Sequence, residues 1–155
     1  MEKAKKTVSA PKVSSAPKPK TASASGKAPR SHGVGRRKSA IARVWLRRGN
    51  GDLSVNGLNY KEYFETDMNR MDASIPMHLV PSATKYDVEV NVRGGGLCAQ
   101  AGAVKLGIAR ALVAIESDLR VLLRKHDLLT VDSRRKERKK YGQKGARRKF
   151  QFVKR

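Results

Sequence analysis

The stretch that decides the fold is residues 86–115, YDVEVNVRGGGLCAQAGAVKLGIARALVAI. Its first eight residues alternate between apolar and polar side chains, which predicts a strand with one core face and one face open to water or a partner. After the triple glycine at 94–96, apolar residues recur at the spacing of one helical face: Leu97, Ala101, Val104, Ile108, Leu112 and Ile115. Ala103 and Ala111 leave room for this helix to pack closely on a sheet.

An earlier strand is predicted at residues 39–48. Small apolar residues there alternate with a more polar set that includes Arg43 and Arg47. Residues 49–52, Gly-Asn-Gly-Asp, predict a turn, because Asn-Gly is a strong hairpin signal. Leu53 and Val55 would then form a short strand that returns beside the first one.

Further helices are predicted from the spacing of apolar residues. One or two short helices ending before Pro76 follow from Tyr63, Phe64, Met68, Met71 and Ile75, and residues 81–84 would form a loop. A shorter helix capped by Ser117 or Asp118 would carry Leu119, Leu122 and Leu123, and the last core contacts would be Leu128 and Leu129. Strands that precede a helix pair predict an α+β domain with two layers.

The charge of the chain is divided into three parts. Residues 1–38 carry 11 Lys and Arg against one acid, residues 39–128 carry 12 against 10, and residues 129–155 carry 12 against two, within a net charge of +22. A nearly neutral segment, long enough for one small domain, therefore lies between two polycations. Arms of the same charge repel each other and stay extended until a polyanion neutralises them.

Residues 1–32 consist mainly of Lys, Ala, Ser, Pro and Thr, with almost no large apolar side chains. Such a segment cannot bury enough surface to offset its loss of entropy, so a disordered basic N-terminal extension is predicted. An organelle transit peptide is the alternative, because it is also basic, rich in Ser and poor in acids. No apolar run approaches the ~20 residues of a membrane span, and the amino end lacks the apolar core of a secretory signal.

Residues 134–155, RRKERKKYGQKGARRKFQFVKR, hold 12 Lys and Arg against one Glu, with Tyr141, Phe150 and Phe152 among the cations. This composition suits RNA, because cations neutralise phosphates and aromatic rings stack on unpaired bases. A solvated basic tail or a localisation patch would have the same composition. A DNA-compacting protein with two basic arms is a second hypothesis, which a preference for structured RNA over duplex DNA would exclude.

The triple glycine between strand and helix has three interpretations. It is a turn that requires positive φ, a contact for an RNA phosphate at the start of the helix, or part of a nucleotide-binding enzyme. For the enzyme, GGGLCAQAG lacks both the Lys-Ser/Thr of a P-loop and the spacing of a dinucleotide site. A second cationic candidate is residues 33–39, from which a basic stripe would continue along Arg43 and Arg47. The alternative there is an ordinary solvated strand edge.

No pattern in the sequence asks for catalysis. The three histidines, His32, His78 and His126, lie far apart, and no nucleophile order or pair of carboxylates stands out. His32 suits a phosphate contact or plain solvation. Cys98 is the only cysteine, so an intrachain disulfide and a cysteine metal cluster are excluded. Its neighbours are small, which predicts a buried residue rather than a reactive thiol, and no cofactor is expected.

Six motifs in register resemble one known family: GRRKSAIARV at 35–44, GNG at 49–51, VNG at 55–57, EYF at 62–64, VNVRGGGLCAQAGAVKLGIARAL at 90–112 and ERKKYGQKGARRKFQF at 137–152. Over residues 33–155 the chain resembles the ninth protein of the small ribosomal subunit in its bacterial form. The usual family ending Phe-Ser-Lys-Arg is here Phe-Val-Lys-Arg, and the chain also departs from the family pattern at Val131 and Phe150.

The resemblance implies a globular α/β domain at residues 33–129 and an extended basic tail at 130–155. The fold would be the two-layer α/β sandwich of the second domain of the fifth small-subunit protein, with a left-handed βαβ crossover. The protein would be a non-enzymatic constituent of the cytoplasmic ribosome, with a plastid or mitochondrial ribosome as the alternative. Its partners would be small-subunit ribosomal RNA, peptidyl-site tRNA and neighbouring proteins of the subunit head, with no membrane.

The resemblance also implies the residues that contact nucleic acid. Those expected to bind ribosomal RNA are Arg36, Arg37, Lys38, Arg43, Arg93, Gly94, Gly95, Gly96, Arg134, Arg135, Lys136, Arg138, Lys139, Lys140, Tyr141, Lys144, Arg147, Arg148 and Lys149. Those expected to contact peptidyl-site tRNA are Phe152, Lys154 and Arg155. An extended chain reaches ~3.3 Å per residue, so such a tail would span tens of ångströms from the domain.

Overall fold

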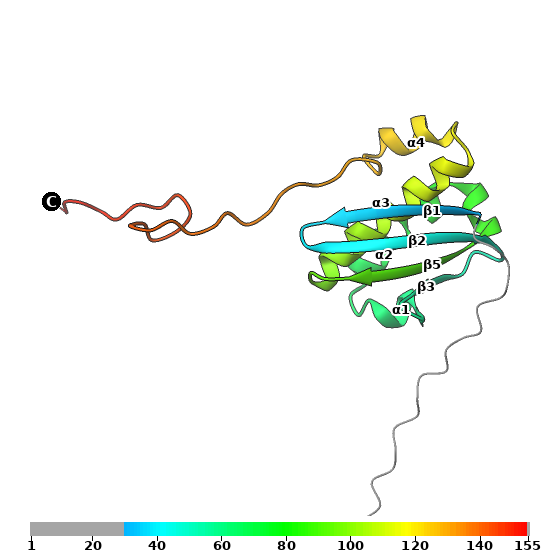
Figure 1. The fold of residues 1–155 in the computed structure, drawn as a ribbon, viewed down its shortest axis with the longest axis horizontal. Helices are drawn as coiled ribbons and strands as arrows, with labels where there is room; N and C mark the ends of the chain where they lie inside the picture. The colour runs from blue at the N-terminus through cyan, green and yellow to red at the C-terminus, as the bar shows by residue number, and fades with distance from the viewer. Residues whose placement is uncertain (1–29, 155) are drawn as a thin grey trace, which may run out of the picture.

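The computed structural model describes residues 30–154, and its fold is a five-stranded sheet with helices on one face (Figure 1). The strands are β1 (Ser31–Arg37), β2 (Ala40–Arg48), β3 (Leu53–Val55), β4 (Leu58–Asn59) and β5 (Tyr86–Arg93), in the spatial order β1-β2-β5-β3-β4. The helices are α1 (Tyr60–Tyr63), α2 (Asp67–Leu79), the 3-10 helix η1 (Pro81–Lys85), α3 (Leu97–Ile115) and α4 (Leu119–Lys125). The expected α+β class is confirmed, whereas the expectations for residues 1–29 and for Arg155 lie outside the described residues.

The two alternating segments form the central antiparallel pair of the sheet. In β5, Tyr86, Val88, Val90 and Val92 are buried while the residues between them are more exposed, as the alternation predicts. Strand β2 pairs with β5 along its length, with Val44 opposite Val90. On its other side β2 pairs with β1, a strand that the sequence analysis did not predict.

The expected hairpin between residues 39–48 and Leu53–Val55 is wrong. Strand β3 pairs with β5 instead, in parallel, with Leu53 opposite Val88 and Val55 opposite Val90, and β5 lies between β2 and β3. The turn is directed by the Asp87 carboxylate of β5, which accepts the backbone N–H groups of residues 50, 51 and 52 at 2.7, 3.1 and 3.3 Å. A turn held by a third strand does not need to close a hairpin.

Helix α2 differs from its prediction in both length and orientation. It continues through Pro76 to Leu79. Proline has no N–H to donate to the helix, but its ring is fully buried, and this burial offsets the lost hydrogen bond. Met68 and Met71 are 69% and 66% exposed, whereas Ala73 and Ser74 are buried. The apolar spacing thus identified a helix but not the face that packs. The expected loop at 81–84 is the 3-10 helix η1.

Helix α3 is the centre of the core. It packs against β1 and β2 on one side and α2 on the other, and 12 of its 19 residues are buried (Figure 1). It is the one described helix long and apolar enough for a membrane span, but most of it is buried in the domain. The predicted face at Ala101, Val104, Ile108 and Leu112 is buried as expected, although Leu97 is 39% exposed.

The contact between α3 and β1 depends on two glycines of β1. A Cβ on Gly35 would lie 1.8 Å from the carbonyl oxygen of Ala103, and a Cβ on Gly33 would lie 2.3 Å from that of Gly107. The Ser31 hydroxyl donates to the Ala111 carbonyl at 2.8 Å, which adds a polar link between the same two elements. The helix therefore approaches the strand backbone at a distance that side chains on the strand would prevent.

Helix α4 and the segment after it close one end of the core. Asp118 occupies the expected N-cap position of α4, but it makes no side-chain capping hydrogen bond. Leu123 and Leu128 are buried, and Leu129 packs against the core from a partly buried position. The expected last core contacts are thus confirmed. Beyond them the chain leaves the domain as the long segment that ends at C in Figure 1.

Candidate nucleic-acid interface

Three segments far apart in the sequence meet at one end of the sheet: the β1–β2 hairpin, the triple glycine and the start of the tail. Gly94 and Gly95 have φ of +74° and +68°, and a Cβ on Gly94 would lie 2.6 Å from the Ser39 carbonyl oxygen. The turn interpretation therefore has a geometric basis at both residues. Gly96 has no neighbouring atom within 4 Å of where its Cβ would be, so this side of the turn is open.

The glycine turn leads into α3 through a small hydrogen-bond network. The Gln100 side-chain amide donates to the Gly94 carbonyl at 3.1 Å, and the Tyr63 hydroxyl donates to Gln100 Oε1 at 2.8 Å. In the first turn of α3, Cys98 is exposed, so the prediction of a buried cysteine is wrong. Gly102 and Ala103 of the same run lie against Arg37 and Gly35 of β1, whereas Cys98 is exposed to solvent.

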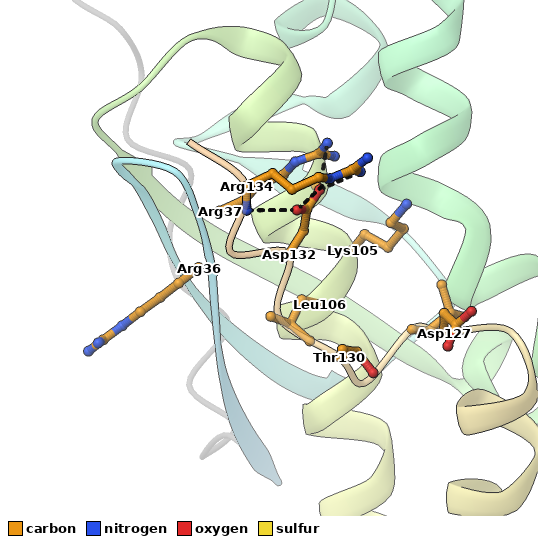
Figure 2. A pocket seen from close by; sticks show the side chains of 10 residues that line it. Arg36, Arg37, Lys105, Leu106, Asp127, Thr130, Asp132 and Arg134 are labelled. Atoms are coloured by element: carbon orange, nitrogen blue, oxygen red, sulfur yellow. Dashed lines mark hydrogen bonds and ion pairs between the residues drawn. The ribbon is translucent and has the colours of Figure 1, made fainter. Parts of the chain in front are cut away.

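The tail is anchored where it leaves the domain, and Asp132 is the centre of the anchor (Figure 2). The Asp132 carboxylate pairs with Arg37 of β1 at 3.1 Å and with Arg134 at 2.8 Å. It also accepts the backbone N–H of Arg134 at 3.1 Å. The hydrogen bonds from the Arg134 side chain and backbone hold the pKa of Asp132 well below its usual range, with a smaller contribution from the charge of Arg37.

A hydrogen bond to the β1–β2 hairpin fixes the next residue of the tail, Arg135. The Arg135 guanidinium donates to the Lys38 carbonyl at the tip of the β1–β2 hairpin, where Lys38 has a φ of +52°. Arg37 is packed so closely over α3 that a Cβ on Gly102 would lie 2.5 Å from its Cδ. The tail therefore departs along the hairpin in a defined direction.

Beyond the anchor the tail contains no helix or strand up to residue 154, but it folds back once on itself (Figure 1). Arg147 forms an ion pair with Glu137, with Nε 2.9 Å from Oε2, and this hydrogen bond lowers the pKa of Glu137. The Lys144 ammonium lies 5.5 Å from the centre of the Phe150 ring, within range of a cation–π interaction. Tyr141 and Phe152 are almost completely exposed.

The face of the sheet opposite the helices is open and carries a second group of cations. Arg36, Arg43 and Arg93 lie on this face, and none of the three forms an ion pair with another residue in the described range 30–154. Figure 2 shows Arg36 directed away from Arg37 and Asp132. The expected basic stripe ends at Arg43, because Arg47 pairs with Glu89 at 3.0 Å.

The residues predicted to bind RNA thus fall into separate groups. At the hairpin end, Lys38 contacts Arg135 of the tail, and Gly94 and Gly95 lie against Ser39 and Ala40. The three open-face arginines form their own group, and the remaining tail residues extend away from the domain. Arg37, Arg134 and Arg147 are paired with carboxylates. The sequence analysis missed Asp132 as the organising residue, although an acid in so basic a segment was the available signal.

The histidines and acids of the described part of the chain do not gather into a metal site. Among residues 30–154, no group of three His, Cys, Asp or Glu side chains is placed to hold a metal ion. His32 lies on the open face, His78 in the last turn of α2, and His126 at the end of α4. What the surface offers instead is exposed cations, exposed rings and an open turn.

The fold and this surface define a class: a small α+β domain with a strongly basic tail. A comparison with protein families identifies one family within that class: the family model described as "Ribosomal protein S9/S16" matches residues 35–155. The chain belongs to this family, whose members are structural ribosomal proteins and not enzymes.

Individual relatives agree with the family match. The chain is 52% identical over 122 residues to the small ribosomal subunit protein uS9 of Cytophaga hutchinsonii, covering 79% of this chain and 95% of the relative. It is 48% identical over 124 residues to the protein of the same name from Maridesulfovibrio salexigens, with 80% and 95% covered. It is 46% identical over 123 residues to that of Borrelia recurrentis, with 79% and 90% covered.

Proposed function

We propose that this protein is a structural constituent of the small ribosomal subunit, that it binds ribosomal RNA in the subunit head, and that its tail end contacts peptidyl-site tRNA. Family membership and the name of the relatives support the first part. The observation that carries the rest is the anchored tail, whose exposed cations and rings leave the domain in one direction.

The proposed RNA contacts are backbone contacts. Cations at the hairpin tip, on the open sheet face and along the tail would neutralise phosphates and position the protein without reading bases. At the glycine turn, Gly96 is the position that a phosphate could approach, because no atom beyond its chain neighbours lies within 4 Å of where a Cβ would be. Gly94 and Gly95 instead serve the turn itself, against Ser39 and Ala40.

The tRNA contact is proposed for Phe152, Lys154 and Arg155, the last of which lies outside the described residues. Once anchored at Arg135, the segment 136–155 can extend up to about 65 Å from the domain. Contacts to the tRNA backbone would suit a site that must accept every tRNA, because phosphate contacts carry no direct sequence information. Val153, where the family usually has Ser, lacks the hydroxyl that could donate to the same RNA.

The proposal also covers the detailed fold, a protein neighbour in the subunit head and the cellular location. Strands β3 and β5 are parallel and are joined through α1 and α2, which supports the two-layer fold of the second domain of the fifth small-subunit protein with its left-handed crossover. The exposed Met68 and Met71 of α2 support contact with a neighbouring head protein. We place the protein in the cytoplasmic ribosome, away from membranes, with an organelle ribosome as the alternative.

The test is assembly followed by tRNA retention. The tagged chain, expressed in a bacterial cell, should migrate with small subunits on a sucrose gradient and remain there after a moderate salt wash. Subunits carrying Lys154→Gln with Arg155→Gln should then assemble normally but retain less peptidyl-site tRNA in a filter-binding assay. Arg120→Gln with Arg124→Gln removes the same charge from α4 and should retain tRNA normally. If the unchanged chain, the tail variant and the α4 variant all retained the same amount of tRNA, the tRNA contact would be excluded. Free protein at the top of the gradient would exclude assembly into the small subunit.

A further inference from the structure

The open face of the sheet carries an aromatic pair next to its arginines. His32 of β1 lies opposite Trp45 of β2, and their ring centroids are 5.5 Å apart with a tilt of 43° between the planes. His32 is exposed and Trp45 is half-buried, so both rings present surface to solvent. Nothing in the core requires a tryptophan here, because the core lies on the other face of β2.

The register of the strands arranges this face in rows. Trp45 lies between His32 and Glu89, Arg43 lies between Val34 and Asn91 in the next row, and Ile41 lies between Arg36 and Arg93 in the row beyond. Successive rows are about 7 Å apart, because side chains on one face alternate every second residue. A flat path of roughly 14 Å therefore runs from an aromatic platform to a cluster of three arginines.

The acids of this face do not cancel those arginines. Glu89 is paired with Arg47, and the Asp87 carboxylate is occupied by three backbone N–H groups of the turn at 50–52. Arg36, Arg43 and Arg93 have no carboxylate partner among the described residues. The net field of the face is therefore positive at the end away from Trp45.

We propose that this open face binds an unpaired segment of RNA, with a base stacked on Trp45 and the following phosphates on Arg43 and then on Arg36 and Arg93. The inference rests on the RNA binding proposed above and adds a site to it. Exposed sheet faces with aromatic side chains bind single-stranded RNA in this way, because every unpaired base has a stacking surface. A paired helix buries its bases, so it could use the arginines but not Trp45.

The chain supplies its own reporter for this test, because Trp45 is the only tryptophan. We would titrate the full-length protein with a labelled single-stranded RNA of about ten nucleotides and follow the anisotropy of the RNA and the emission of Trp45 together. Stacking should quench the tryptophan saturably, with the same midpoint as the anisotropy. A duplex of the same sequence should raise the anisotropy through the tail without quenching, because the tail extends away from the sheet (Figure 1).

Two variants and one control separate the contributions. Trp45→Leu keeps an apolar side chain and should weaken binding of the single strand about fivefold or more, the range expected for loss of one stacked base. Arg43→Gln should move the quenching midpoint to higher RNA concentration. Arg124→Gln removes one charge from α4 and should shift that midpoint less than Arg43→Gln does.

The outcomes distinguish the inference from the proposal beneath it. RNA binding with unchanged Trp45 emission would overturn the open-face site and leave the RNA-binding function intact. Equal quenching by duplex and single strand would overturn the requirement for an unpaired base. Failure of both RNAs to bind would overturn the RNA-binding function itself, and this site with it.

Discussion

Replacing Gly35 by alanine tests how closely α3 lies on β1. The added Cβ would be 1.8 Å from the Ala103 carbonyl oxygen and 2.6 Å from the Gly107 amide nitrogen. Non-bonded heavy atoms pack at about 3.5–4.0 Å, so α3 would have to withdraw by about 2 Å. The atoms in the way are backbone atoms of a buried helix, so no side-chain rotation can relieve the clash.

The expected cost is large for one methyl group. Overpacking a core costs typically about 1–3 kcal/mol, and a clash against backbone belongs at the upper end of that range. The smaller conformational entropy of alanine in the unfolded chain offsets about 0.5–1 kcal/mol. A net loss of about 2–2.5 kcal/mol should lower the Tm by roughly 10–20 °C in a domain of this size. Thermal unfolding of the full chain, followed by circular dichroism, measures it.

Gly145 provides the matched control in the tail. A Cβ there would meet only Cβ of Arg148, at 3.6 Å, which is ordinary contact. Gly145→Ala should therefore change the free energy of unfolding by less than about 0.5 kcal/mol. If Gly35→Ala melted within about 2 °C of the parent chain, the close contact between α3 and β1 would be refuted.

Two further predictions concern the core and the tail anchor. Phe64→Ala, at a fully buried side chain, should cost about 3–5 kcal/mol in urea unfolding, whereas Leu58→Ala, at a half-exposed one, should cost less than about 1 kcal/mol. Asp132→Asn should lower the backbone order of Arg134 in NMR relaxation but change the Tm little, because the Arg134 side chain of this ion pair is 86% exposed. Since the folded pKa of Asp132 is depressed, the anchor should persist from pH 8 to pH 5 and weaken only below the unfolded pKa of about 3.9; loss of order already at pH 6 would contradict this.

The elements that the sequence predicted well are those whose pattern is complete within one segment. The valines of β5 alternate without exception, and the apolar residues of α3 keep helical spacing over four turns. Both patterns report which face is buried, so the strand, the helix and most of their core residues could be derived. The exposed rings and cations of the tail followed from composition in the same way.

The errors concern partners, which local spacing does not encode. Leu53–Val55 was predicted to be a strand and is one, but its neighbour is β5 because Asp87 holds the preceding turn. Strand β1 was missed because glycines at 33 and 35 weaken a strand pattern, yet those glycines are there for α3, about 70 residues away. Met68 and Met71 were spaced like a core face and are exposed.

Some features of the candidate site could likewise be derived from local sequence, and others could not. The glycine turn and the basic segment at 33–39 were found from residue types, because positive φ and clustered cations are local properties. Asp132 as the anchor and Trp45 as part of an open aromatic pair depend on the fold. The first needs the tail beside Arg37, and the second needs β1 to place His32 opposite Trp45.

The packing of β1 on α3 affects how the protein folds during its synthesis. Ser31 donates a hydrogen bond to Ala111 of α3, so this contact forms only after Ala111 has been synthesised. In the same way, β3 gains its parallel partner only after β5 has been synthesised. The first strand therefore waits for some 80 residues, which takes several seconds at the usual 5–20 residues per second of translation. During that time its glycine-rich surface is uncovered, and closure is slow because the contacts are non-local. The polycationic tail is synthesised after the domain, so it leaves the translating ribosome only when the domain can already fold.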